Sequence, residues 1–283
     1  MALDRAGLTS HLRIFDLDAG RADTLLVHDG HIEAPNWHPD GGSLIVNGGG
    51  RLFRVDLAAP TLDLIDTGFA TTCNNDHGIT PDGAHLILTD STELGESCLY
   101  TVSAAGGTPR RVTRHTPSYW HGVSPGGREL AFVGNRGKGF QVFTVSVEGG
   151  EETRLTEDFD HCDGPDYTPD GQWIWFNGER GGAVDLWRMQ RDGSGLERMT
   201  ADETVNWFPH PSPNGDCVVY LAYPPGTQGH PGGLDVELRL LPADGGAPKT
   251  LLALHGGQGT INVPSWAPEG RRFAFVSYED EGA

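Results

Sequence analysis

Residues 165–176 read Pro-Asp-Tyr-Thr-Pro-Asp-Gly-Gln-Trp-Ile-Trp-Phe. A polar approach leads into a tight turn, in which Pro169 presets the first turn position and Gly171 relieves backbone strain at the end. A run of strand-forming residues, Trp173 to Phe176, follows directly. The stretch predicts one β-hairpin, and its pattern recurs along the chain.

Six copies of this turn occur, and their prolines are separated by 42, 44, 44, 44 and 55 residues. The copies are His38-Pro39-Asp40, Thr80-Pro81-Asp82, Ser124-Pro125-Gly126, Thr168-Pro169-Asp170, Ser212-Pro213-Asn214 and Ala267-Pro268-Glu269. Each leads into an apolar strand, then a further strand, a Gly-rich turn and a short outer strand. Four strands in about 44 residues is the period of a propeller blade. The sequence therefore predicts an all-β, six-bladed β-propeller with four antiparallel strands per blade.

The two ends of the chain predict how the ring closes. Residues 11–18 have the pattern of a third blade strand and residues 22–27 that of a fourth, whereas the C-terminal end stops after a second strand, residues 272–277. We expect the last blade to take two strands from each end, which removes open sheet edges. On this interpretation residues 1–283 form a single domain.

Composition excludes several classes of function. The net charge of −19 argues against nucleic acid and anionic membranes as partners, and leaves a protein partner open. No run of 18 apolar residues is present, and residues 1–10 lack a secretory signal pattern, so we expect a cytoplasmic protein. The four cysteines form no C-x-x-C pair and are expected to be buried free thiols.

The repeated turns, together with the blade-closing segments Glu-Thr-Arg-Leu-Thr (152–156) and Leu-Glu-Arg-Met-Thr (196–200), resemble the repeats of TolB-type propellers, also described as PD40 or WD40-like repeats. The resemblance covers nearly the whole chain and implies the fold. The export signal and N-terminal domain of periplasmic TolB proteins are not visible here. The chain is also similar in kind to oligogalacturonate lyases, seven-bladed propeller enzymes with a His-bound metal.

Candidate site residues come from the connections that lead into each inner strand, because these surround the central channel on one face. Their second positions carry two carboxylates, two amides and two aromatic rings: Glu33, Asn75, Tyr119, Asp163, Trp207 and Asn262. Their fourth position is proline in four blades and histidine in two, His77 and His121. Further ligand-binding candidates on these segments are Asp76, Trp120, Asn206 and His210.

The two histidines suggest chemistry near the axis. We expect both imidazoles to face the channel within reach of Asp76, Asp163 or Glu33, around a shared ligand or a divalent metal such as Mn, Zn or Ca. Polar or substrate-contacting histidines are the alternative.

Arg136 and Arg180 occur at one offset in neighbouring blades and suit a planar anion such as a carboxylate. The alternative is that they form rim salt bridges with Glu179, Asp160 or Asp163. The extra length of the fifth blade, residues 223–233, is a candidate lid over the same face.

Two functions remain open from the sequence. In the first, the funnel binds a small polar or anionic ligand such as a sugar or sugar acid. A lyase or metal-assisted enzyme would then use His77, His121, Arg136 and Arg180 as its base and its cationic groups. In the second, the propeller is a non-catalytic scaffold for protein interaction. No Ser-His-Asp signature, phosphate loop or cofactor fingerprint is present.

Overall fold

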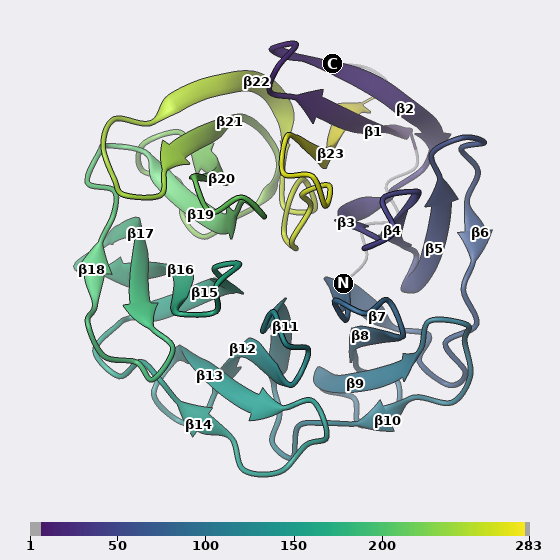
Figure 1. Cartoon of the computed structure of the whole chain (residues 1–283), viewed down its shortest axis with the longest axis horizontal. Coiled ribbons are helices and arrows are strands. Elements are labelled where there is room, and N and C mark those ends of the chain that lie inside the picture. The colour runs from purple at the N-terminus through teal and green to yellow at the C-terminus, as the bar shows by residue number, and fades with distance from the viewer. Residues whose placement is uncertain (1–6, 281–283) are drawn as a thin grey trace.

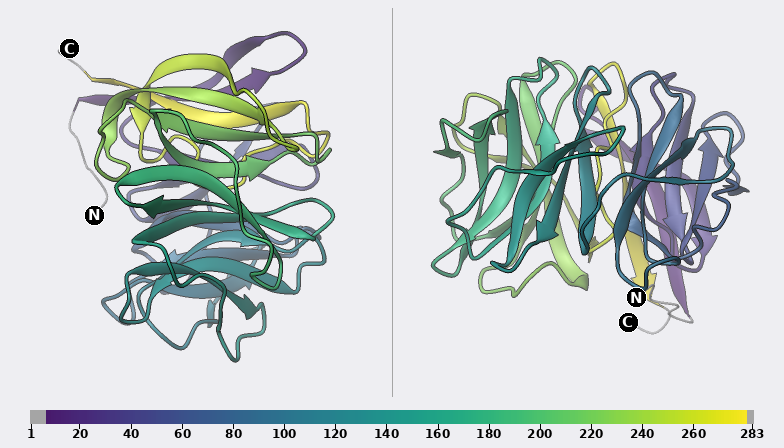
Figure 2. Two further views of the ribbon diagram at one scale, coloured as in Figure 1. Left: turned by 90° about the vertical axis from the view of Figure 1, so that its left-hand side faces the viewer. Right: turned by 90° about the horizontal axis from the view of Figure 1, so that it is seen from below.

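The computed structural model describes residues 7–280, which form a closed ring of six β-sheets without a helix. The sheets radiate from one axis, with their inner strands around the centre and their short outer strands at the circumference (Figure 1). Seen from the side, the strands run across the thickness of the ring (Figure 2). The predicted all-β, six-bladed propeller is confirmed.

Five blades have four antiparallel strands each, ordered along the chain from the axis outward. Blade 1 contains β3 (Glu33–Trp37), β4 (Ser43–Gly48), β5 (Arg51–Asp56) and β6 (Asp63–Leu64). Blade 2 contains β7 (Cys73–Ile79), β8 (His85–Asp90), β9 (Cys98–Ser103) and β10 (Arg110–Arg111). Blade 3 contains β11 (Ser118–Val123), β12 (Glu129–Asn135), β13 (Phe140–Ser146) and β14 (Thr153–Arg154). Blade 4 contains β15 (His161–Tyr167), β16 (Trp173–Arg180), β17 (Ala183–Gln190) and β18 (Glu197–Arg198). Blade 5 contains β19 (Val205–Pro211), β20 (Cys217–Tyr223), β21 (Gly232–Pro242) and β22 (Lys249–Gly257).

Blade 6 joins the two ends of the described chain, as expected, although the C-terminal end supplies one strand of its sheet and not two. It contains β23 (Arg272–Asp280), β1 (Leu8–Asp16) and β2 (Arg21–Asp29). β1 pairs with β23 along its whole length and with β2 from Ser10 to Asp16. The place of the inner strand is taken by residues 258–267, which make a single bridge to β23, between Trp266 and Phe273. This segment turns toward the middle of the ring instead of following the sheet (Figure 1).

The repeated turn has a physical basis in its threonine and aspartate. In blade 4 the Thr168 hydroxyl donates to Asp170 at 2.6 Å and accepts from the amide of Trp173 at 3.0 Å, while Asp170 accepts from the amide of Gln172 at 3.0 Å. Gly171 takes a positive φ of 68°, which glycine adopts without strain. Blade 2 repeats these bonds around Thr80 and Asp82. The Thr-Pro-Asp-Gly motif therefore fixes the hairpin between the two inner strands of a blade.

The core lies between neighbouring blades, so the inner strands are buried on both faces. β3, β4, β19 and β20 are buried at every position. The blades also approach closely: a Cβ on Gly122 would lie 2.6 Å from the carbonyl oxygen of Pro165 in the next blade. All four cysteines are buried and free, as predicted.

Candidate functional site

A polar funnel opens on one face of the ring. Its mouth has a volume of about 900 Å³, and a lower chamber of about 240 Å³ lies deeper. The two spaces are continuous, because six residues from five blades border both of them: Asn74, Asn75, Tyr119, His161, His230 and Gln258. The funnel has the size of a site for a small ligand.

The local backbone of the inner strands turns side chains toward this funnel. In each of the five regular blades the inner strand contains extra residues relative to its partner, so that its pairing register breaks near the middle. Ala34 and Phe208 lie in these breaks with φ of 54° and 55°, values that residues other than glycine seldom adopt. Each costs on the order of 1–3 kcal/mol, and such strain collects at functional sites.

The floor of the funnel is built by residues 258–264 of blade 6, which cross the axis. The Asn262 carbonyl lies 3.3 Å from Nδ1 of His121, in the blade on the opposite side of the ring. The Ile261 carbonyl lies 2.6 Å from Nε2 of His210, and the Pro264 carbonyl accepts from Asn36 at 2.6 Å. These bonds tie the crossing segment to blades 1, 3 and 5.

A buried ion pair lies directly on this floor. Nε2 of His121 is 2.7 Å from Oδ1 of Asp163, and both residues are buried. Burial favours the neutral imidazole, but Asp163 and Asp76 outweigh it and raise the pKa of His121 to about 9. Burial likewise opposes the charge of Asp163, yet the imidazoles around it, His121 first, hold its pKa well below the usual range. Protonated His121 therefore donates to Asp163 and to the Asn262 carbonyl.

Two further histidines converge on the other oxygen of Asp163. Nε2 of His230 lies 3.5 Å and Nε2 of His161 lies 3.9 Å from Oδ2. His230 also bonds through Nδ1 to Gln258 and packs on Trp207, with ring centroids 4.4 Å apart. Burial lowers the pKa of His230, whereas Asp163 outweighs burial at His161 and raises its pKa. Nε2 of His161 is itself buried and makes no hydrogen bond within 3.5 Å among residues 7–280, although Oδ2 of Asp163 lies 3.9 Å away.

The wall formed by blades 1 and 2 carries two buried carboxyl groups, Glu33 and Asp76, and Nε2 of His31 lies 3.9 Å from Glu33. Burial, reinforced by Asp76, raises the pKa of Glu33 to about 8. Burial also raises the pKa of Asp76 to about 6, even though His121 opposes it. Asn75 donates to Glu33 at 3.4 Å, and Asn74 donates to Asp76. At neutral pH this wall presents one protonated and one largely ionised carboxyl group.

The structure brings eight of the predicted residues to the funnel. They are Glu33, Asn75, Asp76, Tyr119, His121, Asp163, Trp207 and Asn262. Six others line neither the mouth nor the lower chamber: His77, Trp120, Asn206, His210, Arg136 and Arg180. Trp120 is fully buried between the blades, and Asn206 bonds to Asp202 and Thr200 behind the funnel wall. His210 uses both ring nitrogens, on Asp166 and Ile261.

His77 does not face the channel, contrary to the expectation from the sequence. It is fully buried, and Nε2 lies 3.3 Å from the Ile45 carbonyl in the neighbouring blade. Burial lowers its pKa to about 4, so it is a neutral side chain that joins blades 1 and 2. The predicted pairing of His77 with His121 around a shared ligand or metal is therefore not formed. Within residues 7–280 no group of three or more His, Cys, Asp or Glu is arranged to hold a metal ion.

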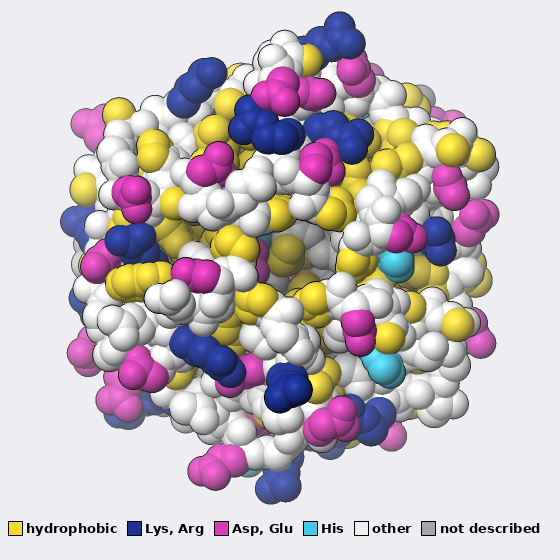
Figure 3. Space-filling model, viewed as in Figure 1, with side chains coloured by type: hydrophobic (Ala, Val, Ile, Leu, Met, Phe, Trp, Pro, Cys, Tyr) yellow, Lys and Arg dark blue, Asp and Glu magenta, His cyan; other side chains and the backbone are white. Residues whose placement is uncertain are grey.

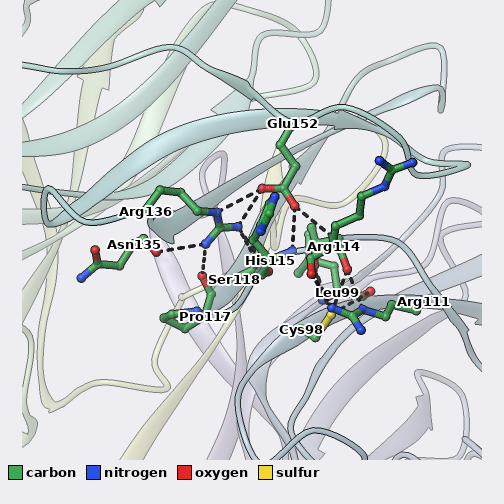
Figure 4. Close-up of polar contacts among 11 residues, drawn as sticks. Cys98, Leu99, Arg111, Arg114, His115, Pro117, Ser118, Asn135, Arg136 and Glu152 are labelled. Carbon is green, nitrogen blue, oxygen red and sulfur yellow. Dashed lines mark hydrogen bonds and ion pairs between the residues drawn. The ribbon is translucent and has the colours of Figure 1, made fainter.

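The two arginines are also engaged elsewhere. Arg136 forms an ion pair with Glu152 at 2.9 Å and donates to the Pro117 carbonyl and the Ser118 hydroxyl (Figure 4). Arg180 stacks over Phe159 at 4.0 Å and donates to the Asp158 carbonyl. Arg136 forms a salt bridge, as the alternative predicts, but its partner is Glu152 and not Glu179, Asp160 or Asp163. Neither guanidinium supplies positive charge to the funnel.

Sequence reasoning missed His161, Asn74 and Gln258 and did not assign a role to His230. His161 lies one residue before Cys162, the first position of the connection that contains Asp163. His230 belongs to the extra segment of blade 5 that the sequence singled out as a lid, and residues 229–233 of that segment do border the mouth. Gln258 lies on the floor segment, whose path across the axis has no signature in the sequence.

Known proteins resemble this chain over nearly its whole length. A family model described as the TolB beta propeller domain matches residues 120–231. An uncharacterised protein of Agrobacterium fabrum is 46% identical over 272 residues, which cover 96% of this chain and 93% of that protein. The chain belongs to the TolB-like β-propeller family. A solved structure of a TolB-type protein from Agrobacterium tumefaciens superimposes on this TolB-like propeller with a TM-score of 0.94 at 46% identity, covering 96% of this chain and 99% of the other.

More distant relatives place limits on what the family implies. The Tol-Pal system protein TolB of Bordetella pertussis is 29% identical over 273 residues, and the match covers 93% of this chain but 58% of that TolB. An oligogalacturonate lyase solved with manganese has a TM-score of 0.57 at 17% identity, covering 90% of this chain and 75% of the lyase, which shows a shared fold alone. The part of the TolB-like chain that the structure describes contains no helix able to cross a membrane. The expected cytoplasmic location stays a prediction.

Proposed function

We propose that this TolB-like propeller binds a small, uncharged polar ligand of the sugar class in its funnel. The lower chamber carries the proposal. Amide, carboxyl and imidazole groups border it together with aromatic rings, which is the combination that recognises hydroxyl groups and the apolar face of a sugar ring. The polar groups are Asn74, Asn75, Asp76, His161 and Gln258, and the rings are Tyr119, Phe140 and Phe208.

The charges of the funnel favour a neutral ligand over a sugar acid. His121 and Asp163 neutralise each other at 2.7 Å. The pKa values of about 8 for Glu33 and about 6 for Asp76 mean that this wall already resists negative charge. A ligand carboxylate would add to that repulsion, and Arg136 and Arg180 lie away from the funnel. The sequence-based expectation of an anionic ligand therefore loses its main support.

Binding is better supported than acid–base catalysis. Both ring nitrogens of His121 are engaged, one by Asp163 and one by the Asn262 carbonyl, which leaves no lone pair to accept a proton. His161 borders both the mouth and the lower chamber, where its ring can contact a bound sugar. We accordingly propose a sugar-binding protein and derive no lyase step.

The test is a binding titration with matched sugar pairs by isothermal calorimetry. Glucose, galactose and mannose are compared with glucuronate, galacturonate and mannuronate near pH 7.5. We expect at least one neutral sugar to bind, and its uronate to bind about tenfold more weakly, or about 1.4 kcal/mol. The difference in affinity between a sugar and its uronate should decrease below pH 6, where Asp76 becomes protonated. Stronger binding of the uronates, or binding of no sugar, would refute the proposal.

A non-catalytic interaction scaffold is the second candidate, favoured by one observation. The Bordetella relative is a Tol-Pal system protein, which favours a role alongside other proteins. That function requires a protein partner and gives the funnel groups no role in sugar binding. His161→Ala separates the two candidates, because it should abolish sugar binding and leave a partner on the outer surface unaffected.

A further inference from the structure

We infer that the funnel recognises the end of an oligosaccharide, with the terminal unit in the lower chamber and the following units leaving through the mouth. This inference rests on the proposed sugar-binding function and specifies which part of a sugar chain is bound. Three features of the funnel support it: the axis is closed, the lower chamber is smaller in volume than the mouth, and polar groups lie at the deep end.

The axis is closed beneath the lower chamber. Residues 261–264 are bonded to His121, His210 and Asn36, which belong to blades 3, 5 and 1. Val263 of the same segment is fully buried in one apolar cluster with Ala34 and Trp120. Seen from the face opposite the funnel, the centre of the ring is hollowed, and side chains close it at depth (Figure 3). A polymer therefore cannot thread through the ring, and its chain must end in the funnel.

The step in width separates one sugar unit from the units that follow. The lower chamber, at about 240 Å³, lies below the roughly 300–1,000 Å³ typical of ligand pockets, whereas the mouth, at about 900 Å³, lies within that range. Tyr119 borders both spaces and Trp207 borders the mouth, so aromatic surface continues outward from the chamber. An internal unit has neighbours on both sides, and residues 261–264 close the axis on the side away from the mouth.

The deep end carries a carboxyl group suited to the free hydroxyls of a terminal unit. Asp76 borders the lower chamber and not the mouth, and its side chain has one hydrogen bond among the described residues, from Asn74. A terminal sugar unit keeps a hydroxyl group that an internal unit has lost to its glycosidic bond. Asp76 is therefore the group that we expect to distinguish an end from an internal position.

The experiment measures how many protein molecules bind one sugar chain. For the glucose, galactose, mannose and xylose series, the monosaccharide, the linear trisaccharide and a long linear homopolymer are titrated with the protein by calorimetry. We expect one binding site per recognised chain end, so the number of proteins per chain stays constant as the chain lengthens. A number that rises with length would show internal binding and overturn end recognition while leaving the sugar-binding function intact. Absence of binding in all four series would overturn both.

A variant gives a second, independent readout. Asp76→Asn should weaken the monosaccharide and the trisaccharide by the same factor, between about threefold and tenfold, because both place the same unit against it. Asp40→Asn, on an exposed turn outside the funnel, is the matched control and should change neither. If Asp76→Asn weakens the monosaccharide but spares the trisaccharide, the longer chain binds in the mouth alone, and end recognition is wrong.

Discussion

Replacing Glu33 by glutamine should stabilise the protein, and increasingly so as the pH rises. The carboxyl group of Glu33 is 8% exposed, and its pKa is raised from 4.5 to about 8, first by burial and then by Asp76. Because the folded pKa lies above the unfolded one, the folded state keeps a proton that the unfolded chain releases. The contribution of Glu33 to the free energy of unfolding is therefore fully present below pH 4.5, and it is lost as the pH rises to about 8.

The size of the effect follows from the shift. One pKa unit corresponds to about 1.4 kcal/mol, so ionisation at this site costs about 3 kcal/mol at pH 7 and about 5 kcal/mol above pH 8. Glutamine keeps the oxygen that accepts from Asn75 and does not titrate, so Glu33→Gln removes that cost. At about 2–4 °C per kcal/mol, the melting temperature should rise by roughly 6–12 °C at pH 7 and hardly at all at pH 4.5.

The assay is thermal unfolding of wild type and variant between pH 4.5 and 8.5. Glu129→Gln is the control of opposite sign, because burial at Glu129 is outweighed by Arg191 and Tyr167 and its pKa is lowered. That variant should be less stable than wild type at pH 7, and the deficit should shrink as the pH falls below 4.5. A difference between Glu33→Gln and wild type that stays constant across pH would refute the reasoning. A stabilised Glu33→Gln would mean that the wild-type carboxyl group is retained at a cost in stability, as expected of a ligand-binding group.

Three further substitutions test other parts of the structure. Asp163→Asn should destabilise the protein by about 3–5 kcal/mol in urea unfolding at pH 7, because it leaves His121 buried without its partner. The pKa of His121, followed by NMR, should fall from about 9. An unchanged pKa would contradict the ion pair. Arg136→Ala should lower the free energy of unfolding by about 2–4 kcal/mol, because the Glu152 side chain is 6% exposed and loses its cationic partner. Sugar affinity should remain at the wild-type value. A loss of affinity in the folded variant would show that Arg136 takes part in ligand binding. Gly78→Ala should destabilise the protein by about 3 kcal/mol or more, because the new Cβ would lie 2.0 Å from the Trp120 ring. A melting temperature equal to that of the wild type would show that the inner strands are less tightly packed than the structure indicates.

The sequence was sufficient for the architecture because the architecture depends on a local motif. Thr168, Pro169, Asp170 and Gly171 close a turn through bonds among themselves and their neighbours, so each copy marks a hairpin wherever it occurs. Six copies at a blade-like period determine the number of blades, and the pattern of residues 11–27 identifies the closing strands. The path of residues 258–264 depends instead on bonds to blades 1, 3 and 5, which no local pattern encodes.

The different outcomes for His77 and His121 show why the site was harder to predict than the fold. Both occupy the fourth position of their connections, and repeat spacing alone makes them equivalent. In β11, however, Trp120 pairs with Phe132 and Gly122 with Ala131, so His121 is itself the extra residue of the bulge and turns to the funnel. In β7 the extra residues are among Asn74–Asp76, which line the lower chamber, and His77 has already rejoined the ladder opposite Leu88. Since side chains alternate between the two faces of a strand, a shift of one residue moves a side chain from the axis into the space between blades. The position of each bulge therefore decides which of two equivalent histidines can meet a ligand, and it depends on packing between blades that a single repeat does not record.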